Sequence, residues 1–418
     1  MVAQPIAVTR AYSAVRFYAL LPYSTHMQAR PPIVVIAPDS FKGSTAASDT
    51  ASAIAEGLRR VWPGAELRLC PMADGGEGTL DAVLSRGGQR LTARVTGAAG
   101  KTVEAGYGIV GEGKIAIIEA AQIVGVTDPD GTAIDVEQRS SRGVGELMAK
   151  LIDGGLLKFM VGLGGTSTND GGAGMLAALG LRLLDSKGRT VDATPEGLAK
   201  LVAVDAAGLD PRLRQTTITI MSDVNNVLAG PRGATAIFGP QKGVRPERVG
   251  ELDARLARFA ALVEKALGKS ARDRPGAGAA GGLGFALQLL GGEMRSGAEV
   301  VADLIGLDAA LHGANWVITG EGRTDAQTLL GKTPLVVARH AAAMGVPATL
   351  ISGGIDRAAL LELSRHFAGC FSLAFGPITL EQCVAQAPGL LADRAEQLAL
   401  LFTALRATLA LASADGEP

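Results

Sequence analysis

Short apolar runs alternate with longer amphipathic stretches along most of the chain. The run IVVIAP at 33–38 is continuous, which is typical of a strand buried on both faces of a parallel sheet. A helix is predicted around 45–60, where apolar residues recur at helical spacing, and Ser44 or Thr45 is expected to cap it. A strand at 66–70 and a second helix, which begins with GTLDAVL, come next. This β-α-β-α order predicts right-handed crossovers and a parallel sheet.

From about residue 91 the pattern changes to short, partly alternating strands separated by Gly-rich turns. Such strands predict an antiparallel hairpin or meander. A helix at 142–155, strands at 158–165 and 217–224, and a long helix near 246–267 are expected to follow.

The stretch RPGAGAAGGLG at 274–284 is the strongest compositional break, and it predicts a hinge or a ligand-binding loop. Strand–turn units resume at 315–322 and 348–354. A helix is predicted to begin near Thr333, and a last helix is predicted around 390–412.

Composition excludes several classes of protein. The chain has 418 residues and a formal net charge of -1, whereas nucleic-acid-binding proteins usually carry a basic excess. No apolar stretch reaches the roughly 18 residues that a membrane span needs. The 3 cysteines lack CxxC spacing, which favours a reduced cytoplasm, and the 4 histidines show no metal-ligand spacing. We therefore expect neither nucleic acid nor membrane as a partner.

Residues 1–30 differ from the rest, because they carry Arg10, Arg16 and Arg30 but no acidic residue. They are either a weak organelle-targeting segment or an upstream extension before a natural start at Met27. We favour a disordered extension, since the folded pattern begins at Pro31.

Polar, glycine-bearing turns follow six of the apolar runs. These turns are IAPDSFKGS, CPMADGGEGT, VGLGGTSTNDGG, MSDVNN, ITGEGRTD and ISGG. A single such turn is most often structural, because Gly, Asn and Asp are ordinary turn residues. Their recurrence after strands is different, since ligands of open α/β sheets bind beyond the carboxyl ends of the strands. The pattern therefore predicts one site built from several loops.

The residue types in these turns suit phosphoryl transfer. Backbone N–H groups of Gly-rich turns bind phosphate, and Lys42 and Lys332 add positive charge. Carboxylates next to such loops would repel a polyanion unless a cation intervened, and Mg²⁺ fits best. No GxxxxGK[ST] motif is present, so this interpretation rests on the constellation of turns.

Seven motifs, in order, resemble those of the bacterial glycerate kinase family, of the glycerate 2-kinase type. They are APDSFKGS, PMADGGEGT, GLGGTSTNDGGAGML, SDVNN, FGPQKG, PGAGAAGGLGFAL and VITGEGRTDAQTLLGKTP. The resemblance implies phosphorylation of D-glycerate by ATP with Mg²⁺, giving 2-phosphoglycerate. It also implies two α/β domains with the active site in the cleft between them. One domain is a flavodoxin-like parallel sheet from both chain ends, 31–90 and 285–418, and the other is an inserted mixed α/β domain, 91–284.

Site residues are assigned by matching these motifs. Asp74 and Asp223 are expected to bind Mg²⁺ or act on the acceptor hydroxyl, and Lys42 to neutralise phosphate or the glycerate carboxylate. The residues expected to bind substrate are Asp39, Ser40, Glu77, Asn169, Asp170, Asn225 and Asn226. Those expected to bind ATP are Gly162, Gly164, Gly165, Thr166, Ser167, Gly281, Gly282, Gly320, Glu321 and Lys332. Glu321 and Asp325 are alternatively helix caps.

Other interpretations stay open at this point. The chain could phosphorylate the 3-position or another small hydroxy acid, or it could be a Mg²⁺-dependent hydrolase or mutase of a phosphorylated acid. A non-catalytic sensor is disfavoured, because an anion receptor gains nothing from many carboxylates. A homodimer is a further expectation.

Overall fold

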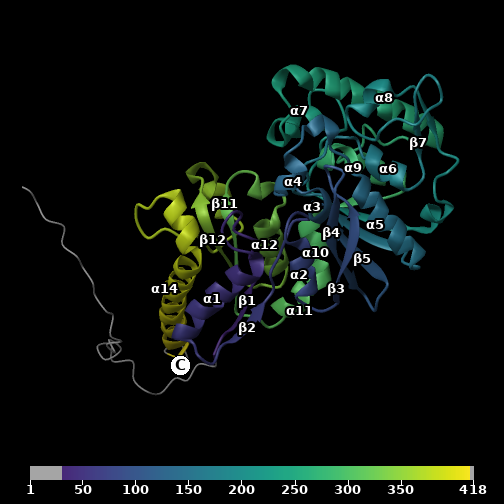
Figure 1. Ribbon diagram of the computed structural model, residues 1–418. Helices are drawn as coiled ribbons and strands as arrows, with labels where there is room; N and C mark the ends of the chain where they lie inside the picture. The colour runs from purple at the N-terminus through teal and green to yellow at the C-terminus, as the bar shows by residue number, and fades with distance from the viewer. Residues whose placement is uncertain (1–30, 415–418) are drawn as a thin grey trace, which may run out of the picture. The chain divides into compact units, whose positions relative to one another are not determined.

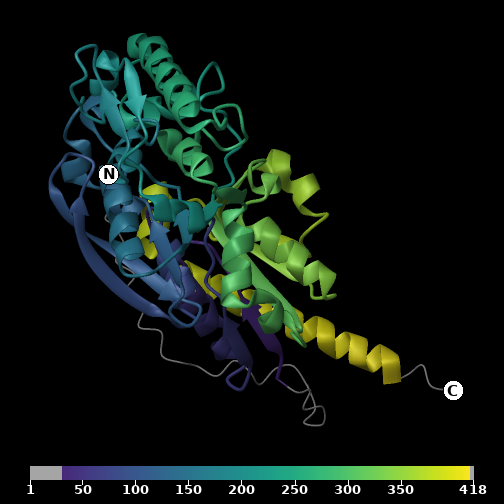
Figure 2. The same ribbon diagram turned by 90° about the vertical axis from the view of Figure 1, so that its right-hand side faces the viewer.

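The structure is a computed structural model that describes residues 31–414 (Figure 1, Figure 2). The extension predicted at residues 1–30 lies outside the described residues. Within the described part of the chain, no helix is long and apolar enough to cross a membrane.

A five-stranded parallel sheet is built from both ends of the chain. Its strands, in spatial order, are β13 (Gly369–Ser372), β12 (Ala348–Ile355), β11 (Trp316–Thr324), β1 (Ile33–Ile36) and β2 (Glu66–Leu69). Every neighbouring pair is parallel, so all five carboxyl ends lie on one edge. The prediction of a parallel sheet from both chain ends is confirmed.

Helices cover both faces of this sheet because its strands are apolar on both sides. Val34 and Ile36 of β1 pack with α1 (Ala47–Val61) and α14 (Leu380–Ala414), which lie side by side in Figure 1. Val35 points the other way and joins a core with α2 (Thr79–Leu84), α10 (Gly297–Ile305), α11 (Leu307–Leu311) and α12 (Thr333–Ala343).

A six-stranded mixed sheet forms the second half of the fold. Its order is β10 (Glu293–Arg295), β9 (Thr217–Met221), β6 (Lys158–Gly162), β5 (Ile115–Glu119), β4 (Thr102–Val110) and β3 (Gln89–Thr96). The β3–β4 and β4–β5 pairs are antiparallel, which confirms the predicted meander, and the remaining pairs are parallel.

The core of this half contains α5 (Arg142–Asp153), α6 (Ala173–Ala178), α8 (Val249–Leu267) and α9 (Leu283–Leu289). Shorter elements are α3 (Ala121–Val124), α4 (Pro129–Thr132), α7 (Ala234–Phe238), α13 (Leu360–Leu363), β7 (Arg182–Leu184) and β8 (Ala203–Asp205). Because β10 and α9 belong to this half, residues 285–295 lie here and not with the parallel sheet. The division of the chain into domains stays a prediction.

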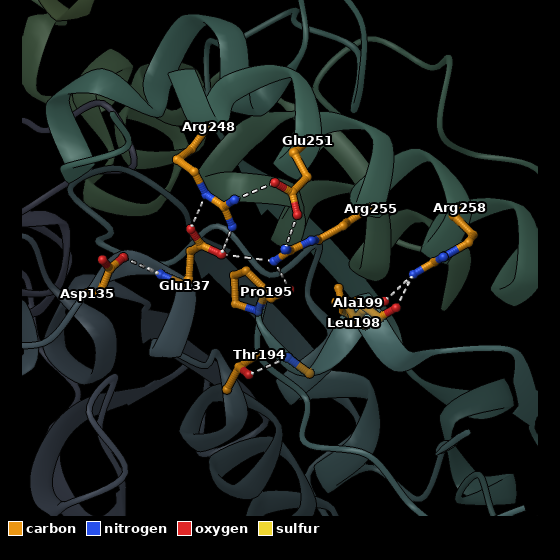
Figure 3. Close-up of polar contacts among 11 residues, drawn as sticks. Asp135, Glu137, Thr194, Pro195, Leu198, Ala199, Arg248, Glu251, Arg255 and Arg258 are labelled. Atoms are coloured by element: carbon orange, nitrogen blue, oxygen red, sulfur yellow. Dashed lines mark hydrogen bonds and ion pairs between the residues drawn. The ribbon is translucent and has the colours of Figure 1, made fainter. Parts of the chain in front are cut away.

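An ion-pair cluster fixes α8 to the short 3-10 helix at Val136–Gln138 (Figure 3). Glu137 lies between Arg248 and Arg255, with N–O distances of 2.7 and 2.9 Å. These hydrogen bonds, the one from Arg248 first, lower the pKa of Glu137. Glu251 pairs with both arginines from within α8. The cluster holds the segment directly before Arg139, whose guanidinium donates to the carbonyls of Ser167 and Lys242.

Two helix starts differ from the predictions. Ala46 precedes α1 and no side chain caps it, because Ser44 donates to the carbonyl of Val384 instead. The last helix begins at Leu380, ten residues earlier than expected. Thr379 and Gln382 form a reciprocal capping box there, with N–O distances of 3.0 and 3.2 Å.

Candidate active site

Four carboxylates converge beyond the carboxyl ends of strands from both sheets. Asp39 follows β1, Asp74 follows β2, Asp223 follows β9, and Glu321 lies in the last part of β11. Asp39 is in electrostatic range of Asp74 and Glu321, and Asp223 is in range of Asp74. The structure thus brings together the acids of four separate motifs.

Asp39 is held by two hydrogen bonds. The Thr333 hydroxyl, in the first turn of α12, donates to Oδ2 at 2.8 Å, and the Ser40 amide donates to Oδ1 at 2.6 Å. Burial, followed by the negative charge of Asp74, raises the pKa of Asp39 to about 7, while the two hydrogen bonds oppose the shift. The negative charge of Glu321 also raises the pKa of Asp39. A carboxyl group with such a pKa exchanges protons near neutral pH.

Asp223 carries an unsatisfied oxygen. Its Oδ2 atom is buried and has no hydrogen-bond partner. Burial raises the pKa of Asp223 to about 6, and the charges of Asp74 and Glu299 add to the shift. The first turn of α10, which Ser296 caps, adjoins this carboxylate and opposes the shift. A buried oxygen without a partner costs free energy unless a proton or a cation satisfies it.

Backbone encloses the Asp74 loop closely. The Gly76 amide donates to Asp74 Oδ1 at 3.1 Å, and the Asp74 side chain is exposed. A Cβ atom on Gly297, the first residue of α10, would lie 1.9 Å from the Asp74 carbonyl oxygen. Glycine is therefore required at 297 for α10 to approach this loop.

Two glycines at the end of β6 and just after it, Gly162 and Gly164, also pack closely against this loop. A Cβ on Gly162 would lie 2.6 Å from the Gly75 carbonyl oxygen, and one on Gly164 would lie 2.5 Å from the Gly76 Cα. The Gly164 amide donates to the Gly75 carbonyl at 3.1 Å. Backbone occupies the space that we expected phosphate to enter. For Gly162 and Gly164 the structure therefore supports a packing role.

The stretch that we predicted to be a hinge is buried between two site loops. A Cβ on Gly281 would lie 2.1 Å from the Thr168 carbonyl oxygen, and one on Gly282 would lie 2.4 Å from the Gly171 Cα. The Gly171 amide also donates to the Gly281 carbonyl at 2.9 Å. Gly278 makes an equally close approach to the chain after Asp223. Three backbone segments pack there, which favours a packing role for these glycines, and the hinge or ligand loop stays a prediction.

The TSTND turn faces inward. The Ser167 hydroxyl donates to the Val124 carbonyl at 3.0 Å, and the Asn169 amide group donates to the Thr235 hydroxyl at 3.0 Å. Thr166 is 5% exposed and Ser167 is 0% exposed. The hydroxyl groups of this turn are thus not presented at the surface in this conformation. Gly165 has a φ of 72° and its carbonyl accepts from Val126.

Asp170 is a structural carboxylate. Its oxygens accept hydrogen bonds from the Ser141 amide and hydroxyl and from the Gly172 and Gly174 amides, at 2.7–3.1 Å. These donors lie at the starts of α5 and α6. We therefore assign Asp170 to holding two helix N-termini, and not to the substrate.

Two buried cations next to this turn were missed by sequence reasoning. Lys242 Nζ donates to the Thr168 carbonyl at 2.7 Å, and burial lowers the pKa of Lys242 to about 7. Arg139 donates to the carbonyls of Ser167 and Lys242 itself at 3.3 and 3.0 Å. The motif FGPQKG contains Lys242, but nothing in its local pattern shows that the lysine is interior.

Five other predicted residues are exposed or partly exposed. Lys42, Glu77 and Asn225 are exposed, whereas Asn226 donates to the Arg232 carbonyl at 2.9 Å. Lys332 directly precedes α12 and is partly exposed.

Gly320 and Glu321 belong to β11. A Cβ on Gly320 would lie 2.2 Å from the Ile351 carbonyl oxygen, so a neighbouring strand fills this space. Glu321 accepts hydrogen bonds from the hydroxyls of Thr324 and Thr328 at 2.9 and 2.7 Å, and burial raises its pKa. Asp325 caps the following turn by accepting from the Gln327 amide at 2.8 Å.

The comparisons with known proteins agree with the motifs. The model of the glycerate kinase family matches residues 34–403. A glycerate kinase of Bacillus subtilis (strain 168) is 41% identical over 361 residues, 85% of this chain and 93% of the relative. The glycerate 2-kinase of Escherichia coli (strain K12) is 43% identical over 325 residues, 77% of this chain and 85% of the relative. The chain belongs to the glycerate kinase family.

A solved structure supports the fold of this kinase. A crystal structure from Salmonella typhimurium LT2, assigned as a glycerate kinase 2, aligns with a TM-score of 0.78 at 40% identity. The alignment covers 90% of this chain and 99% of the Salmonella chain. The relatives are kinases and thus phosphotransferases, so the α/β fold and the enzyme class are both confirmed.

The residues of the kinase fit a divalent cation. Among residues 31–414, no group of three or more Asp, Glu, His or Cys side chains could hold a metal. Mg²⁺ in phosphotransferases is usually held by one or two carboxylates together with substrate phosphates and water. Asp223, with its unpartnered buried Oδ2, and the exposed Asp74 provide that smaller set.

Proposed function

We propose that this protein transfers the γ-phosphoryl group of ATP to D-glycerate and forms 2-phosphoglycerate, with Mg²⁺ as the cofactor. The observation that carries the proposal is the convergence of Asp39, Asp74, Asp223 and Glu321. Phosphoryl transfer requires a proton acceptor for the attacking hydroxyl and carboxylates that hold the metal. The relative in Escherichia coli named glycerate 2-kinase supports the 2-position.

Asp39 is the proposed acceptor of the hydroxyl proton. A general base works best when its pKa lies near the working pH, and the pKa of Asp39 is raised to about 7. Thr333 and the Ser40 amide keep the carboxylate oriented. This assigns Asp39, first expected only to bind substrate, a more direct role than the motifs alone suggested.

Asp223 and Asp74 are the proposed ligands of Mg²⁺, which would neutralise charge on the phosphates when bound. A cation would satisfy the buried Oδ2 of Asp223 and relieve the repulsion between the two carboxylates. Lys42, exposed in the loop after β1, is proposed to bind phosphate or the glycerate carboxylate. Asn225, exposed beside Asp223, is proposed to orient the substrate.

The nucleotide is proposed to lie along the edge where the parallel strands end. The close backbone contacts at Gly162, Gly164, Gly281 and Gly282 leave these glycines a packing role. The start of α12, with Lys332 before it, is the better proposal for phosphate, because helix N-termini favour anions. The resulting active site would lie between the loops of the two sheets.

A coupled assay of ATP consumption tests the proposal. Purified protein is incubated with ATP, Mg²⁺ and a panel of small hydroxy acids that includes both enantiomers of glycerate. We expect turnover of D-glycerate, and loss of turnover when EDTA removes the metal. Phosphorus NMR of the product identifies the position of phosphorylation.

Two results would contradict parts of the proposal separately. Turnover of a different hydroxy acid with D-glycerate untouched would overturn the substrate. A 3-phosphoglycerate signal would overturn the 2-position and leave the kinase activity standing.

A further inference from the structure

His340 lies between two carboxylates on two different helices. From α12, its Nδ1 is 2.6 Å from Asp308 Oδ1 of α11, and its Nε2 is 2.9 Å from Glu299 Oε2 of α10. The His340 side chain is 17% exposed, whereas Asp308 and Glu299 are 62% and 38% exposed. One imidazole ring therefore joins three helices.

The chemistry of this contact requires a charged ring. A neutral imidazole donates through one nitrogen only, so its second nitrogen would present a lone pair to a carboxylate. Only the imidazolium donates to both groups at once. Burial lowers the pKa of His340, but the hydrogen bonds and charges of Asp308 and Glu299 outweigh burial, and the pKa is raised above its usual value.

The two larger helices joined by His340 both begin at the active site. The first turn of α10 contains Glu299 and adjoins Asp223, and its Gly297 packs on the Asp74 carbonyl. The first turn of α12 carries Thr333, which donates to Asp39. His340 therefore connects the helix beside the proposed metal ligands to the helix that orients the proposed base.

We propose that His340 is a positioning residue of this kinase, and that its imidazolium sets the separation of the α10 and α12 N-termini through Glu299 and Asp308. The proposal goes beyond the proposed function, because it holds whichever glycerate hydroxyl receives the phosphoryl group. Above the pKa of His340, one of the two contacts is lost and the helices are free to shift. Misplacement of reacting groups by about 1 Å can cost on the order of 100-fold in rate.

The expected pH dependence has a definite sign. Because the folded-state pKa of His340 is raised, both contacts are complete below its usual pKa of about 6.5 and are lost as pH rises through the folded value. The kinase activity should therefore show a descending limb at the pKa of His340. The ascending limb belongs to a different group and should not respond to changes at His340.

Two variants test the proposal with two independent measurements. NMR titration of the imidazole in the full-length enzyme gives the pKa of His340, and kcat/KM for D-glycerate is measured across pH. In Asp308→Asn we expect the NMR pKa and the descending limb to move down together, by about one unit. In His340→Gln we expect kcat/KM to fall by about 10- to 100-fold at low pH and the descending limb to disappear.

His366→Gln is the matched control, because His366 is an exposed histidine in the same half of the fold. It should leave kcat/KM and the pH profile unchanged. A descending limb that stays in place in Asp308→Asn while the NMR pKa moves would overturn the proposal. So would a His340→Gln enzyme that melts lower but keeps the parent rate and profile, since His340 would then act on stability alone.

Discussion

The hydroxyl of Thr333 donates a hydrogen bond to Asp39 across 294 positions of sequence, at 2.8 Å. This bond joins the first turn of α12 to the loop after β1, and it stabilises the charged form of the Asp39 carboxyl group. Two residues from opposite ends of the chain thus set one acid–base equilibrium.

Thr333→Val should raise the pKa of Asp39 further, because it removes a donor to the carboxylate. The ascending limb of the pH–rate profile, followed from pH 6 to pH 8.5, should move to higher pH. The measurement is kcat/KM for D-glycerate over that range. Thr319→Val is the control, because Thr319 is buried and donates at 2.8 Å to the Ala37 carbonyl, not to a carboxylate. An unmoved limb in Thr333→Val would contradict the prediction.

Asp39→Asn should lose activity and change how stability depends on pH. Loss of a general base typically costs about 10²–10⁴ in kcat. Because the folded-state pKa of Asp39 is raised from 3.8 to about 7, the native state binds more protons than the unfolded state in that interval. The parent should therefore lose stability as pH rises from about 4 to 7, and the variant should lose less. Thermal melting of both proteins at pH 4.5 and pH 7.5 measures this difference, and parallel curves would refute the assignment.

Asp223→Asn and Asp74→Asn should each lower kcat severely and leave the fold intact. Asn is nearly isosteric with Asp but is a poor ligand for Mg²⁺, so the affinity for the metal should fall. Partial recovery at high Mg²⁺ concentration, measured with ATP held constant, would identify metal binding. Asp130→Asn serves as a control, because its side chain is 76% exposed and pairs only loosely with Lys101 at 3.4 Å. If a variant melts like the parent and turns over within about threefold of it, the substituted aspartate is only a turn residue and does not bind the metal.

Gly281→Ala should destabilise the protein by at least about 2 kcal/mol. The added Cβ would lie 2.1 Å from the Thr168 carbonyl oxygen, and Gly281 has a φ of 65°, where alanine is strained. Gly250→Ala, in the first turn of α8 with nothing within 4 Å of the added Cβ, should be neutral or slightly stabilising. Urea unfolding of both variants measures the contrast. Equal stability of the two variants would show that the backbone of residues 276–282 moves at little cost in free energy, as the hinge interpretation requires.

Lys242→Met should remove a pH dependence of stability at alkaline pH. The pKa of Lys242 is lowered from 10.5 to about 7, so between these values the unfolded state binds more protons than the native state. Stability of the parent should rise with pH over this interval, and the variant should lack that component of the slope. Melting temperatures at pH 7.0 and pH 9.5 test this expectation. Other groups that titrate there contribute equally to both proteins, so identical slopes would mean that Lys242 has an ordinary pKa.

Local patterns were sufficient to predict much of the fold. The apolar run at Ile33–Ile36 and the Pro334-containing start of α12 carry their signals within a few residues. The capping box of Thr379 and Gln382 is an equally local signal, and it marks the start of α14 ten residues before the predicted one. Ser44 does not cap α1, because its hydroxyl donates to the carbonyl of Val384, 340 positions away. No local pattern predicts such a distant contact.

The structure brings the predicted acids together, whereas it packs several of the predicted glycines against backbone. Asp39 and Asp74 follow neighbouring parallel strands of one sheet, so topology alone gathers these two. Asp223 follows β9 of the other sheet, and it comes near Asp74 only through tertiary packing. A glycine that admits a phosphate and one that admits another backbone segment look the same in sequence. Only the tertiary contact of Gly164 with Gly76 separates the two roles. Lys242 and His340 depend on distant partners for the same reason.

The enclosure of residues 74–76 by Gly162, Gly164 and Gly297 limits how this enzyme can be redesigned. A library that varies these glycines would mostly return misfolded proteins, because no larger side chain has room beside the loop. New acceptor preferences must come instead from side chains that reach solvent, such as Lys42, Glu77 and Asn225. The loop of residues 74–76 is thus held by glycines that tolerate little variation. Substrate selectivity is expected to depend on the few exposed side chains around it.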